Sequence, residues 1–292
     1  MNKEILIESF YSGWFENKKD LKLNGEVIAY MSKELDQEFL KNLKLNKIMD
    51  QGAIAKVQSA ISKKSLIPAY TSESWLGDIF DTFFNVFTGY SGVILGFYDG
   101  KRIVVLMTNI RDLSGSIGQR ELYDIIVHEY QHKFAHDHAT YSSDPNVIKT
   151  LREWYTYFIE EYFGNTITPL LKNKLLKFWT NIKSENLDKT HKTIEGRFKE
   201  LVKIYNESLK TESQEGLERL SSLVDYTEDK YMYDRIDPRS HKAFWAGHEA
   251  YKKMNIKPHT LVYQEFVIAS EVTAVMFSGL PELGNHSLKK FL

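Results

Sequence analysis

The sequence predicts an α+β fold that is mostly α, with one small β-sheet among many helices. Apolar residues recur at the three- and four-residue spacing of amphipathic helices over most of the 292-residue chain. The clearest β-rich runs are residues 93–98 and 102–107, on either side of Asp99-Gly100. A hydrophobic content of 42% is enough to fill a core in a chain of this length, so we expect a folded protein.

The amino-terminal part of the chain is predicted to be helical. Residues 1–70 are rich in lysine and asparagine, and their apolar residues follow helical spacing. The residues that show this spacing best are Leu35, Phe39, Leu40, Leu43 and Ile48. Residues 75–87 have a much higher apolar density, which suits a buried helix. We therefore expect a helical amino-terminal segment over residues 1–70 and a larger unit over residues 71–292.

A hairpin and a series of helices make up the larger unit. Asp-Gly is a favoured two-residue turn, so the β-rich runs beside Asp99-Gly100 should pair antiparallel. No glycine or proline lies between Gly118 and Pro145, which favours one long helix there. The further helices that the spacing predicts cover residues 146–163, 170–224, 240–253 and 261–277.

Charge and cysteine content exclude several classes of function. A formal charge of −1 at pH 7 gives no electrostatic case for a nucleic-acid partner. The absence of cysteine excludes disulfides and thiolate metal sites, and leaves histidine, glutamate and aspartate as metal ligands. No run approaches the roughly 20 apolar residues of a membrane span, and the amino terminus lacks the apolar run of a signal peptide. We therefore expect a cytoplasmic protein with no membrane partner, and the sequence leaves its oligomeric state open.

Residues 128–132 carry the strongest chemical signal in the chain. They read His128-Glu129-Tyr130-Gln131-His132, and residues four apart on a helix lie one turn apart on the same face. Two imidazole nitrogens placed in this way can converge on a Zn²⁺ ion at roughly 2.0–2.1 Å. Zinc lowers the pKa of a bound water toward about 7, and the adjacent glutamate is placed to take the proton. The motif therefore predicts a zinc site with His128 and His132 as ligands and Glu129 as general base.

The helix that contains this motif also resembles a known group of enzymes. The run Ile125-Ile126-Val127-His128-Glu129-Tyr130-Gln131-His132 resembles the active-site helix of the HExxH zinc metallopeptidases, the zincins. The resemblance implies peptide hydrolysis, with a peptide or a protein as the substrate. It also implies a zincin-like metallopeptidase domain over residues 71–292, in which an edge strand ahead of the helix pairs with an extended substrate.

A catalytic zinc site needs a third protein ligand and one open position for water. Glu271 is the preferred third ligand, because its helical neighbours are apolar and a buried carboxylate persists only with a partner such as a metal ion. The small Ala274, one turn on, would let the two helices approach closely. The resulting Glu-x-x-Ala pattern resembles the third-ligand helix of many glutamate zincins.

Two alternatives for the third ligand stay open. Glu153 lies 21 residues after His132, close to the separation in the thermolysin-like branch, but its helical neighbours are polar. His138 lies ten residues after His128, the offset of the third ligand in metzincins. An unbroken helix, however, carries His138 roughly 15 Å along its axis from His128, out of reach of the metal.

Other classes of function are compatible with the same motif. One is a binding or structural protein with a zincin fold, whose metal is silent or purely structural. Such a site would be closed by a fourth protein ligand, for which His136, one turn beyond His132, is the candidate. Another is a two-histidine metal site that hydrolyses a non-peptide substrate. An open coordination position separates a hydrolytic site from a structural one.

Overall fold

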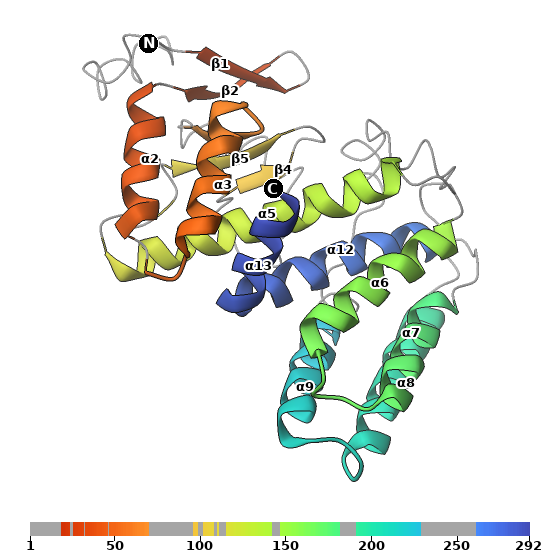
Figure 1. Ribbon diagram of the computed structural model, residues 1–292. Coiled ribbons are helices and arrows are strands. Elements are labelled where there is room, and N and C mark those ends of the chain that lie inside the picture. The colour runs from red at the N-terminus through yellow and green to blue at the C-terminus, as the bar shows by residue number, and fades with distance from the viewer. Residues whose placement is uncertain are drawn as a thin grey trace. The chain divides into compact units, whose positions relative to one another are not determined.

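The structure of the protein is a computed structural model, and Figure 1 shows the course of its chain. The residues that it describes are 19–23, 26–31, 33–45, 47–69, 96–98, 102–107, 110, 115–141, 147–181, 191–228 and 261–292. They belong to two compact units. The first unit comprises residues 1–85, 90–133 and 278–292, and the second comprises residues 86–89 and 134–277.

The first unit combines helices with two small sheets. Its elements are β1 (Lys19–Leu23), β2 (Glu26–Met31), α2 (Lys33–Leu45), α3 (Gln51–Ser62), β3 (Leu66–Ala69), β4 (Gly96–Tyr98), β5 (Ile103–Leu106), α5 (Ser116–Tyr141) up to residue 133, and α13 (Pro281–Phe291). Figure 1 labels these elements except β3, in colours that run from red to yellow-green, with α13 in blue.

A three-stranded sheet supplies the core of the first unit. Its strand order is β3-β5-β4, with β3 parallel and β4 antiparallel to β5. The pairing of Gly96 with Val105 confirms that the two β-rich runs pair antiparallel, while the predicted Asp99-Gly100 turn lies outside the described residues. Every residue of β3 and β5 is buried, as expected of strands that are covered on both faces.

The amino-terminal segment is helical only in part. Helices α2 and α3 agree with the prediction. Residues 19–23 and 26–31 instead form the antiparallel pair β1–β2, and residues 66–69 form β3, so the helical prediction is wrong for these residues. The sequence of β2 is rich in β-branched and aromatic residues, and Asn24-Gly25 between the strands is a strong hairpin signal. These local signals prevail over the helical spacing that begins at Leu35. The boundary between residues 70 and 71 stays a prediction.

The second unit consists of helices and the loops between them in its described residues. These helices are α5 from residue 134, α6 (Val147–Phe163), α7 (Pro169–Thr180), α8 (His191–Ser208), α9 (Gln214–Glu228) and α12 (Leu261–Gly279) up to residue 277. Aromatic rings join α6 to α7, because Tyr155 stacks on Trp179 with 4.0 Å between ring centroids. Buried Arg197 of α8 donates to the Phe178 carbonyl near the end of α7. Together the two units confirm a mostly α fold with a small β component.

Several predicted segments lie outside the described residues. They are the buried helix over residues 75–87, the strand residues 93–95 and the helix over residues 240–253. The helices predicted over 146–163 and 261–277 are confirmed as α6 and α12.

Among the helices that the structure describes, none combines the length and the apolar character that crossing a membrane requires.

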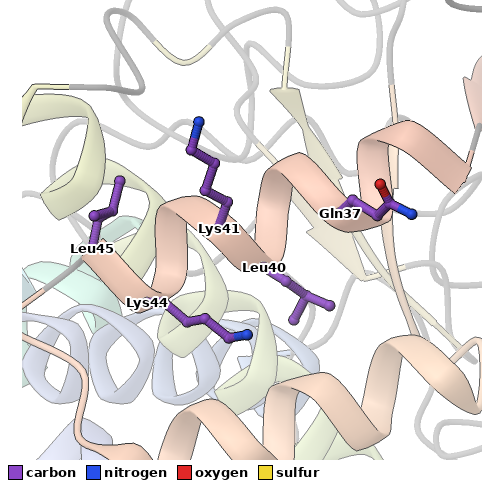
Figure 2. A pocket seen from close by; sticks show the side chains of 5 residues that line it. All are labelled: Gln37, Leu40, Lys41, Lys44 and Leu45. Atoms are coloured by element: carbon purple, nitrogen blue, oxygen red, sulfur yellow. The ribbon is translucent and has the colours of Figure 1, made fainter.

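A hollow of about 400 Å³ lies on the surface of α2 (Figure 2). The residues that line it are Gln37, Leu40, Lys41, Lys44 and Leu45. Two lysines, two leucines and an amide offer neither an imidazole nor a carboxylate to a cation. This hollow is therefore not a candidate for the metal site that the sequence predicts.

Two glycines of the second unit are expected to respond in opposite ways to substitution by alanine. A Cβ atom at Gly216, near the start of α9, would lie 2.3 Å from the Thr166 carbonyl oxygen and 3.0 Å from Ile167 Cγ2. A Cβ atom at Gly196, inside α8, would have nothing within 4 Å. Gly216→Ala should therefore destabilise the protein by about 1–3 kcal/mol, and Gly196→Ala should stabilise it by about 0.5–1 kcal/mol. Chemical denaturation of both variants checks this, and equal effects would contradict the α9 packing.

Candidate metal centre

Helix α5 places the two predicted histidine ligands on one face. The helix runs without a break from Ser116 to Tyr141, which puts His128 and His132 one turn apart. Their Nε2 atoms lie 3.0 Å apart, and their ring centroids are separated by 4.7 Å. Two nitrogen ligands at roughly 2.0–2.1 Å from a tetrahedral zinc ion lie about 3.3 Å apart. The two imidazoles therefore have nearly the spacing that one shared cation requires.

Helix α12 supplies a carboxylate to this pair. One carboxylate oxygen of Glu271 and one ring nitrogen of each histidine all lie within 4.8 Å of one another. The Glu271 residue is only 6% exposed, and Val272, Thr273 and Ala274 beside it are buried as well. The burial that the sequence predicts for this carboxylate is thus confirmed. The three side chains form a group that could hold a metal ion.

The chemistry of these donors fits zinc. Imidazole nitrogen and carboxylate oxygen are both common zinc ligands, and three of them leave one position for water or substrate. The charge fits as well, because the carboxylate of Glu271 is buried. Burying an ion costs several kcal/mol unless an opposite charge compensates it. A divalent cation held by this group would compensate the charge of the Glu271 carboxylate.

Glu129 lies beside this group and against strand β4. It is 8% exposed and does not belong to the set of three ligands. A Cβ atom at Gly96 would lie 3.4 Å from Glu129 Cγ and only 2.6 Å from Ile125 Cγ2. The absence of a side chain at Gly96 therefore lets the strand backbone approach the helix at Glu129. Gly96 is not among the residues predicted from the sequence, although an isolated glycine within a strand pattern is the signal of such a close approach.

Arg120 ties the end of α12 to the helix that carries the histidines. Its Nη2 donates to the Ser278 carbonyl at 2.9 Å, and its Nε lies 2.9 Å from Asp124 Oδ1. A cation at the carboxyl end of a helix stabilises the last carbonyl groups, which have no partner within the helix. Burial raises the pKa of the Asp124 carboxyl above its usual range, although the hydrogen bond from Arg120 opposes this shift.

The other proposed ligands do not belong to the group of three. Glu153 has a 44% exposed side chain that lies 3.5 Å from His138 Nε2 and 3.8 Å from Lys149 Nζ. Both Glu153 and His138 therefore belong to a surface ion-pair cluster. His136 is buried, with its Nδ1 3.6 Å from Asp137 Oδ1, and it is not among the three ligands either. Of the residues that the sequence predicts as metal ligands, the structure brings together His128, His132 and Glu271.

Comparison of the chain with models of known families, with curated proteins and with solved structures finds no match. A function is therefore inferred from the group of two histidines and one glutamate, together with the buried Glu129.

Proposed function

We propose that the protein is a zinc-dependent metallopeptidase in which His128, His132 and Glu271 hold the metal and Glu129 is the general base. The observation that carries this proposal is the convergence of two imidazole nitrogens and a buried carboxylate within 4.8 Å. A bound zinc ion would supply a Lewis acid that polarises the scissile carbonyl and lowers the pKa of a water to about 7. The zincin resemblance of residues 125–132 supports the same activity.

Glu129 performs the proton transfers in this proposal. It follows His128 directly, so its side chain leaves the helix about 100° round from that ligand. From this position its carboxylate accepts a proton from the attacking water and then gives it to the leaving amine. The low exposure of Glu129 supports this role, because a general base shielded from bulk water interacts more strongly with a group positioned beside it.

Strand β4 supports a peptide as the substrate rather than a small ester. Among the described strands, β4 lies at the edge of the sheet β3-β5-β4, and its Gly96 lies against Glu129. An edge strand offers unpaired backbone N–H and C=O groups, which bind an extended peptide by strand addition. A peptide bound in this way would pass close to the general base.

The number of ligands favours a hydrolytic site over a purely structural one. A structural zinc site has four protein ligands, whereas the group found among the described side chains has three. His136, the residue that would close the site, is not one of them. This count supports the hydrolase and argues against a purely structural metal site.

Metal content and chelation test the proposed activity. Untagged protein should contain about one equivalent of zinc by mass spectrometry and should cleave labelled peptides or casein. A chelator should abolish the cleavage, and added zinc should restore it, because the ligands remain in place. An ester substrate assayed in parallel tests the non-peptide alternative. Stoichiometric zinc without cleavage of any peptide would favour the structural protein, and the absence of bound zinc would contradict both.

A further inference from the structure

Gln131 is a fully buried amide within the turn that carries both histidines. Its Nε2 donates to Ser287 Oγ at 2.6 Å, and both residues are 0% exposed. Ser287 lies on α13, 156 residues further along the chain. Helix α13 is therefore hydrogen-bonded to α5 between the positions of His128 and His132.

Two further contacts from the same end of the chain hold α5. The Tyr123 hydroxyl donates to the Pro281 carbonyl at 3.0 Å, and Arg120 donates to the Ser278 carbonyl at 2.9 Å. Together with Gln131, these residues span about 16 Å of the helix at 1.5 Å per residue. His128 lies within this span. The segment from residue 278 to the end of the chain therefore holds the part of α5 that carries the metal ligands.

Helix α13 is itself anchored to the start of α3. Asn285 Oδ1 accepts a hydrogen bond from the Asp50 N–H at 3.1 Å, and Asn285 Nδ2 donates to the Ile48 carbonyl at 2.8 Å. Lys289 Nζ lies 2.7 Å from Asp50 Oδ2. Sliding or rotation of α13 would break these contacts. Ser287 is therefore a fixed point against which Gln131 is held.

We propose that the Gln131–Ser287 hydrogen bond sets the rotation of α5 about its axis and so aims both imidazoles at the metal. This inference rests on the proposed function. At the outer radius of a helix, about 5–6 Å, a rotation of about 10° moves a side-chain end by about 1 Å. That displacement is large compared with the narrow range of zinc–nitrogen distances. A hydrogen bond is directional and apolar packing is not, so the bond defines this angle.

A double-mutant cycle separates this positioning role from a contribution to stability alone. Ser287→Ala and Gln131→Met each leave one buried polar group without its partner, so each should lower the midpoint of thermal unfolding. The double variant replaces both partners with apolar groups. Its midpoint should return to the wild-type value or exceed it, because Gln131 Oε1 also has no partner among the described residues. The double variant thus provides a folded protein even where a single variant does not.

Zinc affinity would not change if the Gln131–Ser287 hydrogen bond contributed to stability alone. The dissociation constant, measured in full-length protein by competition with a chromophoric chelator, should rise roughly tenfold or more in the double variant. The visible absorption of the Co²⁺-substituted protein should change as well, since it reports ligand geometry. Ser62→Ala serves as the control, because the hydroxyl of this exposed serine donates to the Gln58 carbonyl within its own helix, α3. It should leave the zinc affinity unchanged.

The outcomes separate failure of this inference from failure of the proposed function. Wild-type zinc affinity and Co²⁺ absorption in the double variant would overturn the positioning role and leave the peptidase proposal intact. Wild-type protein that binds neither Zn²⁺ nor Co²⁺ would overturn both.

Discussion

Glu129→Gln protein is expected to retain its zinc and to cleave peptides roughly 10²–10⁴ times more slowly than the wild type. Glutamine preserves the size of the side chain in a buried position but cannot accept the proton of the attacking water. The substitution leaves the three proposed ligands unchanged. The loss should therefore appear in kcat, with zinc content and the midpoint of thermal unfolding close to those of the wild type.

Glu160→Gln provides the matched control for this experiment. It makes the same chemical change on the exposed surface of α6 and should leave both turnover and zinc content unchanged. Parallel assays of the two variants on one labelled peptide give the comparison. Near-normal turnover in Glu129→Gln protein would remove Glu129 from the mechanism, whatever the metal content.

The long helices were the part of the fold that the sequence predicted best. Between Gly118 and Pro145 no helix-breaking residue occurs, and α5 fills almost the whole interval, as Ser116–Tyr141. The same reasoning predicts α6 and α12, whose apolar stripes are continuous. Local spacing and the positions of glycine and proline carry this information. They are less informative for β1–β2, where a short hairpin competes with a helical pattern further along the chain.

The histidine pair could also be predicted, because both candidate ligands and the proposed base lie in one turn of one helix. The choice of Glu271 over Glu153 depends on burial, which the apolar neighbours of Glu271 indicate in the sequence. The contact between Gln131 and Ser287 could not be predicted in this way. Its partners are 156 residues apart, and neither residue type carries a local signal for such a contact. Contacts of this kind follow only from the packing of whole helices.

Glu271→Ala protein is expected to lose zinc, whereas Glu153→Ala protein should retain it. Removal of a ligand should weaken zinc binding by more than the roughly 10–100-fold that accompanies loss of an outer-shell partner. Glu153 instead lies in the surface cluster with His138 and Lys149, and its loss costs only an exposed ion pair. Zinc content after dialysis, measured on both variants and the wild type, gives the first comparison.

Thermal unfolding with and without zinc also tests, as a free energy, whether Glu271 is a zinc ligand. At a zinc concentration 100 times the wild-type Kd, binding stabilises the folded protein by about 2.7 kcal/mol. If Glu271→Ala raises the Kd 100-fold, the gain at that concentration falls to about 0.4 kcal/mol. Were Glu271 only one half of a buried ion pair, its removal would instead destabilise the zinc-free protein by about 3–5 kcal/mol. The zinc-dependent gain would then equal that of the wild type, and Glu271 would no longer be a ligand.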